Sequence, residues 1–217
     1  MSRASSELHA AAGSNGMAAL EDALRLPPKE LQAALSARDA GKNTPLHIAS
    51  YKGHVSFVSK ILALPDCGEL SNLPNDNGNT PLHLAVLGNH LEIVRALLLA
   101  AQPANLHMKD KQGYTPMHYA CGEGFLDIAQ VNPPPPPALH TTFACAHTRV
   151  PVLLLQLLYS LGSPFDVTNL EGLTPLMCCS QQGHLHIVRF IIDKDPRCVF
   201  FCNTAGDTAL HYAGEAG

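Results

Sequence analysis

Histidine and cysteine are the residue types in this chain that could do chemistry, with 12 histidines and seven cysteines among 217 residues. His140, Cys145 and His147 lie close together in the sequence, and side chains of these types bind zinc. The group offers three ligands, and its spacing matches no zinc motif well. We therefore expect no metal site in this chain.

Two adjacent cysteines, Cys178 and Cys179, could form a redox pair or could be small buried side chains, and we favour burial. The motifs of dinucleotide-binding proteins, P-loop enzymes, serine hydrolases and zinc proteases do not occur in the sequence. Paired catalytic carboxylates are not visible either. We therefore expect no catalytic residue, no cofactor and no enzyme activity.

A run of five prolines offers a different chemistry, that of peptide recognition. Such a run forms a polyproline II helix, which the aromatic grooves of SH3, WW and EVH1 domains bind. A contact of this kind is one expectation for the run; the other is that it has no function. The run consists of Pro133, Pro134, Pro135, Pro136 and Pro137.

Composition limits the classes of protein to consider. The chain is 46% hydrophobic and 15% charged, so it can bury a sizeable core. Its net charge is −4, and its 14 lysines and arginines form no basic stripe, which argues against nucleic-acid binding. The N-terminus lacks a secretory signal, and the most apolar run, residues 150–161, is too short to insert into a membrane. Seven scattered cysteines fit a reducing compartment, the cytoplasm or the nucleus.

A repeated motif positions most of these histidines. The segments NTPLHIASYKGHVSFV, NTPLHLAVLGNHLEIV, YTPMHYACGEGFLDIA and LTPLMCCSQQGHLHIV align, and DTALHYAGEAG follows near the end. Their threonines lie at 44, 80, 115, 174 and 208, with intervals of 36, 35, 59 and 34 residues. The interval that contains the prolines is the anomalous one.

The T-P-L-H-x-A motif with a period near 33 residues resembles the ankyrin repeat. The resemblance implies an all-α ankyrin-repeat solenoid, in which helix-turn-helix units are joined by hairpin-like turns, here interrupted by a proline-rich insertion. It also implies that the motif histidines are structural and hydrogen-bond the turns. The expected units are a degenerate N-terminal capping repeat at 1–38, repeats at 39–74, 75–109, 110–168 and 169–202, and a truncated repeat at 203–217.

Local sequence signals agree with these helices. Each motif threonine can cap a helix, and the proline after it, as in Thr44-Pro45, suits the first helical position. Leu46, Ile48 and Ala49 supply an apolar face. The first helix should end in a left-handed residue at Gly53, Gly124 and Gly183, and at Asn15 and Asn89.

The insertion has two interpretations. Removing residues 131–156 shortens the interval of 59 to 33 and leaves a normal repeat. Valine codons begin with GT, a glutamine codon can end in AG, and 26 codons preserve the frame, so we favour a translated, unspliced intron. The alternative is a genuine functional loop. If the insertion is present in the protein, we expect a loop at 132–149 and a helix at 152–161.

Ankyrin-like stacks usually bind partners on the concave side, through turn tips and the exposed side of each first helix. The resemblance places on that side Lys42, Asn43, Tyr51, Lys52, Asn77, Asn79, Leu87, Gln112, Tyr114, Glu123, Glu171, Leu173, Gln181 and Gln182. Among these, Leu87, Tyr114 and Leu173 are apolar or aromatic where solvent is expected, so they are candidates for partner contacts. The alternative is that they contact only the neighbouring turns.

Three functions fit the sequence. The first is a non-catalytic scaffold that binds an unidentified protein partner. The second is the regulatory ankyrin portion of a larger enzyme or channel, since the last repeat is incomplete and would leave an apolar face exposed. The third is a non-functional isoform that retains an intron.

Overall fold

The computed structural model describes residues 3–64, 68–124 and 149–215. The regular structure of these residues is helical, apart from an isolated antiparallel bridge between Cys202 and Thr208. The predicted all-α fold is therefore confirmed. The chain divides into two compact units, residues 1–119 and 120–217, and each is described by itself.

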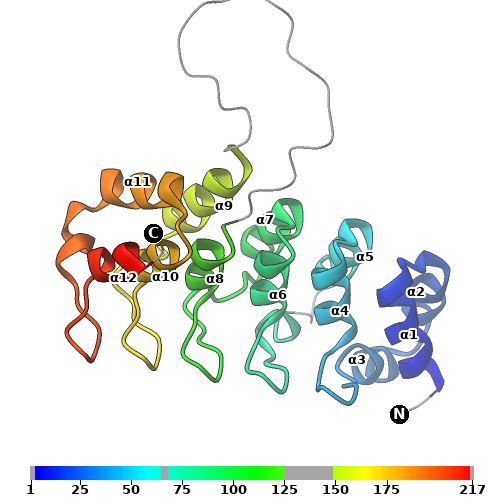
Figure 1. Cartoon of the computed structure of the whole chain (residues 1–217). Helices are drawn as coiled ribbons and strands as arrows, with labels where there is room; N and C mark the ends of the chain where they lie inside the picture. The colour runs from blue at the N-terminus through cyan, green and yellow to red at the C-terminus, as the bar shows by residue number, and fades with distance from the viewer. Residues whose placement is uncertain (1–2, 65–67, 125–148, 216–217) are drawn as a thin grey trace, which may run out of the picture. The chain divides into compact units, whose positions relative to one another are not determined.

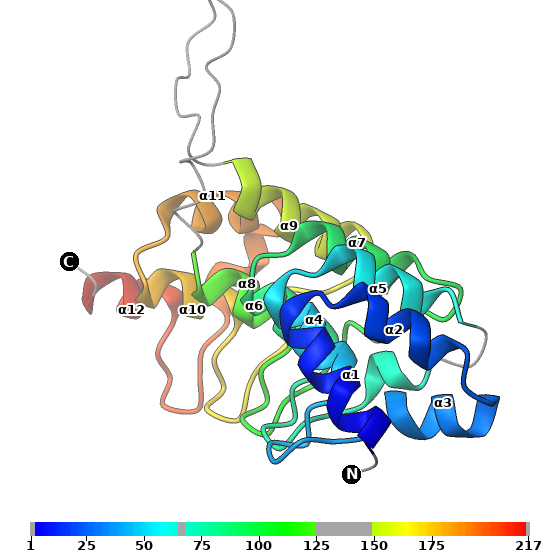
Figure 2. The same cartoon turned by 90° about the vertical axis from the view of Figure 1, so that its right-hand side faces the viewer.

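The first unit consists of helix pairs that pack side by side. In Figures 1 and 2, α4 lies beside α6, α5 lies beside α7, and the turns before α4 and α6 project from the same side. Its elements are α1 (Arg3–Ser14), α2 (Met17–Leu24), α3 (Pro28–Leu35), α4 (Pro45–Lys52), α5 (Val55–Leu62), the 3-10 turn η1 (Leu70–Asn72), α6 (Pro81–Leu87), α7 (Leu91–Leu99) and the start of α8 (Pro116–Gly122).

The second unit repeats the same pairing. Helix α10 packs against both α11 and α12, and α9 packs against α11. Its elements after α8 are α9 (Arg149–Ser160), α10 (Pro175–Gln181), α11 (Leu185–Lys194), the 3-10 helix η2 (Pro196–Phe200) and α12 (Ala209–Glu215). None of the described helices combines the length and the apolar character needed to cross a bilayer.

The start and end of the first helices follow the predicted signals. Thr44 caps α4 from an extended conformation, φ −85° and ψ 166°, and Pro45 takes the first helical position. The helix ends at Gly53 with φ +82°, and Asn89 takes the same left-handed conformation after α6 with φ +55°. These residues set the sharp reversal between the two helices of a repeat.

The core lies between adjacent helices of the same kind. Leu46 and Leu82 are almost fully buried, and the small Ala49 and Ala85 beside them are also buried. Small side chains at these positions let the helix backbones approach closely. One expectation needs correction, because Ile48 is only half-buried and does not belong to the fully buried core.

The expected N-terminal cap forms three helices. Helix α1 packs against α4, and His9 of α1 reaches the main-chain oxygen of Asn43 with its Nε2 at 3.0 Å. A histidine thus connects this degenerate repeat to the next one, as the motif histidines do. The sequence did not predict α3, which lies at the end of this first unit. That residues 1–38 act as a cap stays a prediction.

The helix after the insertion forms close to the predicted place. Helix α9 spans Arg149–Ser160, against an expectation of 152–161, and it buries Leu154, Leu155 and Leu158. Residues 149–156, which we assigned to the insertion, are therefore part of a packed helix. The prolines at 133–137 and the His140, Cys145 and His147 group lie outside the described residues.

Candidate functional site

Each turn of the first unit is held by one side chain that accepts two backbone N–H groups. Asp39 Oδ1 accepts from Gly41 N at 2.9 Å and from Asn43 N at 2.7 Å. Asn75 and Asp110 bind their own turns in the same way. Short acceptor side chains of this kind fix a turn from within. The backbone of each turn tip therefore has a defined conformation.

Asp76 is the acidic residue of the second turn, but it does not hold that turn. Asn75, one position earlier, accepts the backbone N–H groups there. The carboxylate of Asp76 instead lies 2.6 Å from Lys42 Nζ of the preceding turn.

The motif histidines are structural, and the geometry defines their tautomer. His47 Nε2 lies 3.1 Å from the main-chain oxygen of Asn79, which can only accept, so Nε2 carries the proton. Nδ1 then accepts from Thr44 N at 3.1 Å. Burial lowers the pKa of His47 to about 4, and the same cause lowers that of His83 to about 4. Both side chains are neutral at pH 7 and cannot act there as acids.

The histidines connect repeats in both directions. His83 Nε2 reaches forward to the main-chain oxygen of Tyr114 at 3.2 Å, as His47 does to Asn79. The second recurrent histidine reaches back: His90 Nε2 lies 2.9 Å from the main-chain oxygen of Tyr51. In the second unit, His184 makes the equivalent contact with Gly122 at 3.0 Å. These bonds give His47, His83, His90 and His184 a structural role without metal or catalysis.

The residue before the capping threonine is buried in two of the repeats. Leu173 and Asn79 are only 5% and 7% exposed, so neither offers the partner contact we expected. Tyr114, at the same position of the next repeat, illustrates the packing of this residue. Its ring lies 5.7 Å from that of Tyr119 in the first turn of the following helix. Side chains flanking a helix N-cap commonly pack together in this way. For these positions the alternative interpretation, contact with neighbouring turns, is the better one.

The other candidate residues are accessible to different degrees. Tyr51 is 48% exposed. The exposed candidates are Lys42, Tyr51, Lys52, Asn77 and Gln112 in the first unit, and Glu123, Glu171, Gln181 and Gln182 in the second. The half-buried candidates are Asn43, Leu87 and Tyr114.

Partly exposed apolar residues form pairs on the first helices, and half of them are not among the predicted site residues. Ile48 and Tyr51 lie three positions apart on α4, and Leu84 and Leu87 lie three positions apart on α6. Residues with this spacing share a helix face. We call these four residues the apolar strip. Its signal in the sequence is the apolar residue that follows each motif histidine.

Four cysteines of the second unit are core residues, as expected for Cys178 and Cys179. Burial raises the pKa of Cys178 to about 12 and also raises that of Cys179. Cys121 and Cys198 are buried as well, and burial raises the pKa of Cys198 to about 11. Thiols that stay protonated are poor nucleophiles and poor metal ligands. Among the described residues, no cluster of three or more potential ligands could hold a metal ion.

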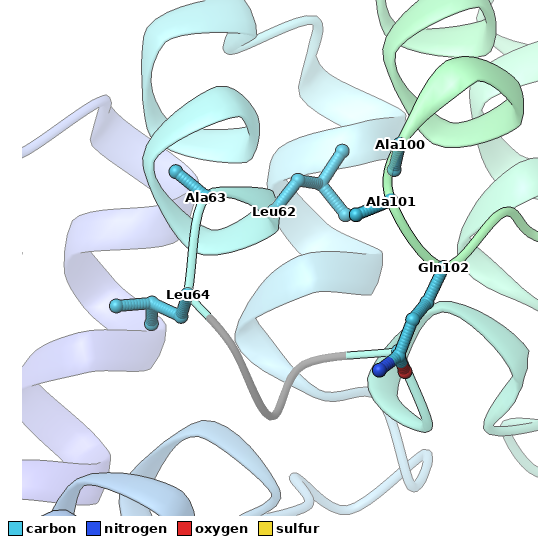
Figure 3. A pocket seen from close by; sticks show the side chains of 7 residues that line it. Leu62, Ala63, Leu64, Ala100, Ala101 and Gln102 are labelled. Carbon is cyan, nitrogen blue, oxygen red and sulfur yellow. The ribbon is translucent and has the colours of Figure 1, made fainter.

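A cavity of about 190 Å³ lies between the ends of α5 and α7, away from the turns (Figure 3). The lining residues are Leu62, Ala63, Leu64, Gly68, Ala100, Ala101 and Gln102. Gln102 is the polar side chain among them, and the lining has no charged group. This cavity lacks the convergent polar groups of a small-molecule site.

Comparison with known families gives three matches. The model of the ankyrin repeat matches residues 41–68, the model of ankyrin repeats in many copies matches 64–120, and the model of three ankyrin repeats matches 142–217. A search of curated proteins found no match.

Proposed function

The chain belongs to the ankyrin-repeat family, and from that premise we propose that it is a non-catalytic scaffold that binds a partner protein through its turns and first helices. Ankyrin repeats are generally protein–protein interaction modules. In ankyrin stacks this surface is the concave side. A cytoplasmic or nuclear location stays a prediction, as does the regulatory or isoform role.

The apolar strip is the observation that carries this proposal. Tyr51 and Leu87 occupy the same motif position in successive repeats, and α4 packs beside α6, so the strip continues from one helix to the next. Aromatic and large apolar side chains that stay partly exposed are typical anchors of protein interfaces. The rigid turns next to the strip add polar groups at its border. Such a surface supports protein binding better than small-molecule chemistry.

The proposal predicts where a partner touches the chain. A photo-crosslinking amino acid placed at Tyr51 should capture a protein in cells, because this side chain would lie in the interface. Val55 on α5 is the matched control position, since it is apolar and 41% exposed but lies on a second helix. We expect adducts from position 51, and few or none from position 55.

A second-site variant tests the strip itself. Leu87→Asp should remove the adducts formed from position 51, because a desolvated carboxylate in the interface costs several kcal/mol. Far-UV circular dichroism would check that the variant folds. Equal adducts from positions 51 and 55, or adducts that persist in Leu87→Asp, would contradict binding through the strip.

A further inference from the structure

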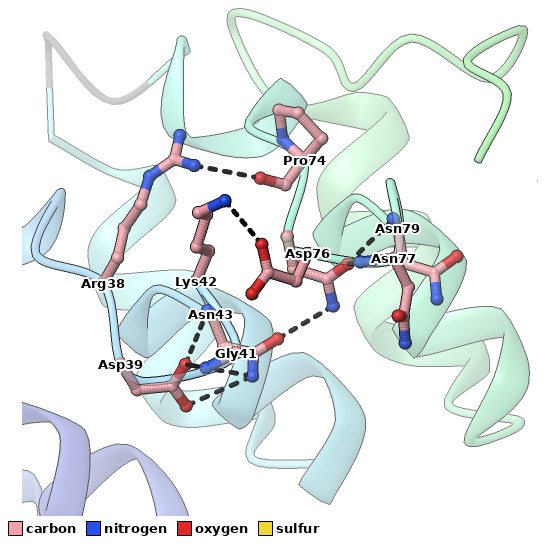
Figure 4. Close-up of polar contacts among 10 residues, drawn as sticks. Arg38, Asp39, Gly41, Lys42, Asn43, Pro74, Asp76, Asn77 and Asn79 are labelled. Carbon is pink, nitrogen blue, oxygen red and sulfur yellow. Dashed lines mark hydrogen bonds and ion pairs between the residues drawn. The ribbon is translucent and has the colours of Figure 1, made fainter. Parts of the chain in front are cut away.

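One carboxylate on the turns of the first unit pairs with a lysine and lies within the electrostatic influence of two more cations. Lys42 Nζ lies 2.6 Å from Asp76, and Arg38 lies beside them (Figure 4). The hydrogen bond from Lys42 is the main cause that lowers the pKa of Asp76, and the charges of Lys42, Lys111 and Arg38 add to it. This group could not be recognised in the sequence, because its members come from four of the expected units, 1–38, 39–74, 75–109 and 110–168.

Backbone hydrogen bonds between neighbouring turns hold this group in register. Asp76 N donates to Gly41 O at 2.9 Å, and Lys111 N donates to Asn77 O at 3.0 Å. These bonds place Lys111 in the turn that follows Asp76, while Lys42 lies in the turn before it. The positions of the charges are thus set by main-chain geometry, and only the side-chain ends need to move when a ligand arrives.

Arg38 is anchored across the same turns. Its guanidinium donates to the main-chain oxygen of Pro74 at 3.2 Å, as Figure 4 shows. This bond uses one of its five donors, and a guanidinium can offer the others to a carboxylate in a bidentate arrangement. The side chain remains exposed, so a ligand could reach it.

The other two carboxylates of these turns do not face the cations. Asp39 accepts from Gly41 N, Asn43 N and Asn43 Nδ2 within its own turn. Asp110 is buried, and it binds its own turn and accepts from the Tyr119 hydroxyl at 2.6 Å. The three turns together hold four cations, Arg38, Lys42, Lys109 and Lys111, and three aspartates, so they carry a net charge of +1. The turns are therefore weakly positive, although the whole chain carries a net charge of −4.

The corresponding turns of the second unit show that these cations are not needed to build a turn. Residues 168–173 and 202–207 contain no lysine or arginine, and Glu171 is exposed there. Asn169 and Asn203 nevertheless hold those turns as Asp39 holds its own. Among these described turns, lysine and arginine occur only in the first unit, which points to a use beyond folding.

We propose that residues 38–43, 74–79 and 109–114 form a docking surface for an acidic segment of a partner protein. Carboxylates of that segment would bind Arg38, Lys42 and Lys111, with Lys42 shared between Asp76 and the ligand. The inference rests on the proposed protein-binding function and names the chemistry of the partner. Complementary charge of this kind speeds association and selects the partner.

An acidic protein segment fits this surface better than a nucleic acid does. Asp76 lies among the cations and would repel the closely spaced phosphates of a polyanion, whereas carboxylates on a flexible peptide can bind on either side of it. Binding to RNA is therefore the competing outcome in the test.

The test uses the full chain and a fluorescein-labelled 12-residue peptide of alternating Glu and Ser, measured by fluorescence anisotropy at 25 and 150 mM NaCl. We expect binding that weakens several-fold at the higher salt, because exposed charges are screened. Lys111→Glu should weaken it about tenfold, a loss of about 1.4 kcal/mol. Arg95→Glu on α7 makes the same charge change at an exposed site away from the turns, and should change affinity less than about twofold.

A variant that is expected to bind the acidic peptide more tightly gives the sharpest test of the proposal. Asp76→Asn removes the carboxylate that competes for the cations, so the peptide should bind about threefold more tightly. No binding, an equal loss in Arg95→Glu, or no gain in Asp76→Asn would each overturn the proposal. Tighter binding of a labelled 12-nucleotide oligo(U) would assign the surface to RNA instead.

The two proposals can fail separately. If the crosslinks from position 51 form in wild type and persist in Lys111→Glu, while the acidic peptide does not bind, the scaffold function stands and the acidic partner is wrong. If neither crosslinks nor peptide binding occur, the scaffold function itself fails.

Discussion

At the scale of single residues, neutral histidines join one repeat to the next. Protonation of His47 would place a second proton on Nδ1, which accepts from Thr44 N. That hydrogen bond would be lost, and a positive charge would be placed in a buried site. The lowered pKa of His47 and of His83 therefore has a consequence for stability.

Stability should fall as the pH falls from about 6.5 towards 4. The unfolded chain takes up protons on these histidines near pH 6.5, whereas the folded chain resists protonation until about pH 4. Each neutral buried histidine makes its full contribution to the free energy of unfolding above pH 6.5. Below that pH the contribution falls, by about 2 kcal/mol per histidine at pH 5. Urea unfolding between pH 5 and pH 7.5 measures this slope.

In the variant His83→Gln, the unfolding free energy should fall by about 1–2 kcal/mol less between pH 7.5 and pH 5 than in wild type. The reason is that glutamine can donate to Tyr114 O but does not titrate. His107→Gln, at an exposed histidine, is the control and should leave the slope unchanged. A slope that is the same in wild type and in His83→Gln would contradict the neutral, buried histidine.

In the second unit, the exposed cysteine should react with thiol reagents faster than the buried cysteines. Cys202 is exposed, whereas Cys121, Cys178, Cys179 and Cys198 are buried. Brief treatment of the native chain with N-ethylmaleimide, followed by peptide mapping, should find Cys202 modified and the four buried thiols protected. Urea should expose all of them. Rapid native modification of Cys198 would show that η2 opens readily.

At the scale of elements, a glycine ends the first helix for two reasons. Gly53 has φ +82°, and a Cβ there would come within 2.6 Å of the ring of His90 from the following repeat. That ring binds Tyr51 O, so it cannot withdraw without losing its hydrogen bond. The backbone conformation and the packing of the next repeat thus require the same residue.

Gly183 separates the two effects. It has φ +72°, but a Cβ there would meet nothing within 4 Å. Gly183→Ala should therefore cost about 1 kcal/mol from backbone strain alone, and Gly53→Ala should cost at least about 1 kcal/mol more. Urea unfolding of both variants measures the difference. Equal costs would mean that the contact with His90 relaxes freely.

The sequence predicts those parts of the fold that depend on neighbouring residues in the chain. The capping threonine, the proline after it and the left-handed Gly53 and Asn89 are local, and the structure confirms them. Burial of Leu173 was missed, because it depends on packing around the N-cap. The cations around Asp76 were missed because they are set by the register between turns 34 or more residues apart.

At the scale of the whole molecule, each repeat is stabilised by its neighbours. The same motif residue therefore contributes a different free energy of unfolding in different repeats. Leu176 and Leu210 both lie two positions after the motif threonine of their repeat, and both belong to the second unit. Leu176 is fully buried, whereas Leu210 is 81% exposed. Their difference isolates the contribution of stacking from the contribution of the motif itself.

Leu176→Ala should cost about 2–5 kcal/mol, since it leaves a cavity in a packed interface. Leu210→Ala should cost less than about 0.5 kcal/mol, as a substitution on an exposed surface. Chemical unfolding followed by far-UV circular dichroism compares the two, with wild type at two protein concentrations. If Leu210→Ala proves as costly as Leu176→Ala and stability rises with concentration, then Leu210 packs against a second copy of the chain. If stability does not depend on concentration, an equal loss of unfolding free energy in the two variants would contradict the prediction. Burial by a neighbouring repeat would then not determine how much this leucine stabilises the protein.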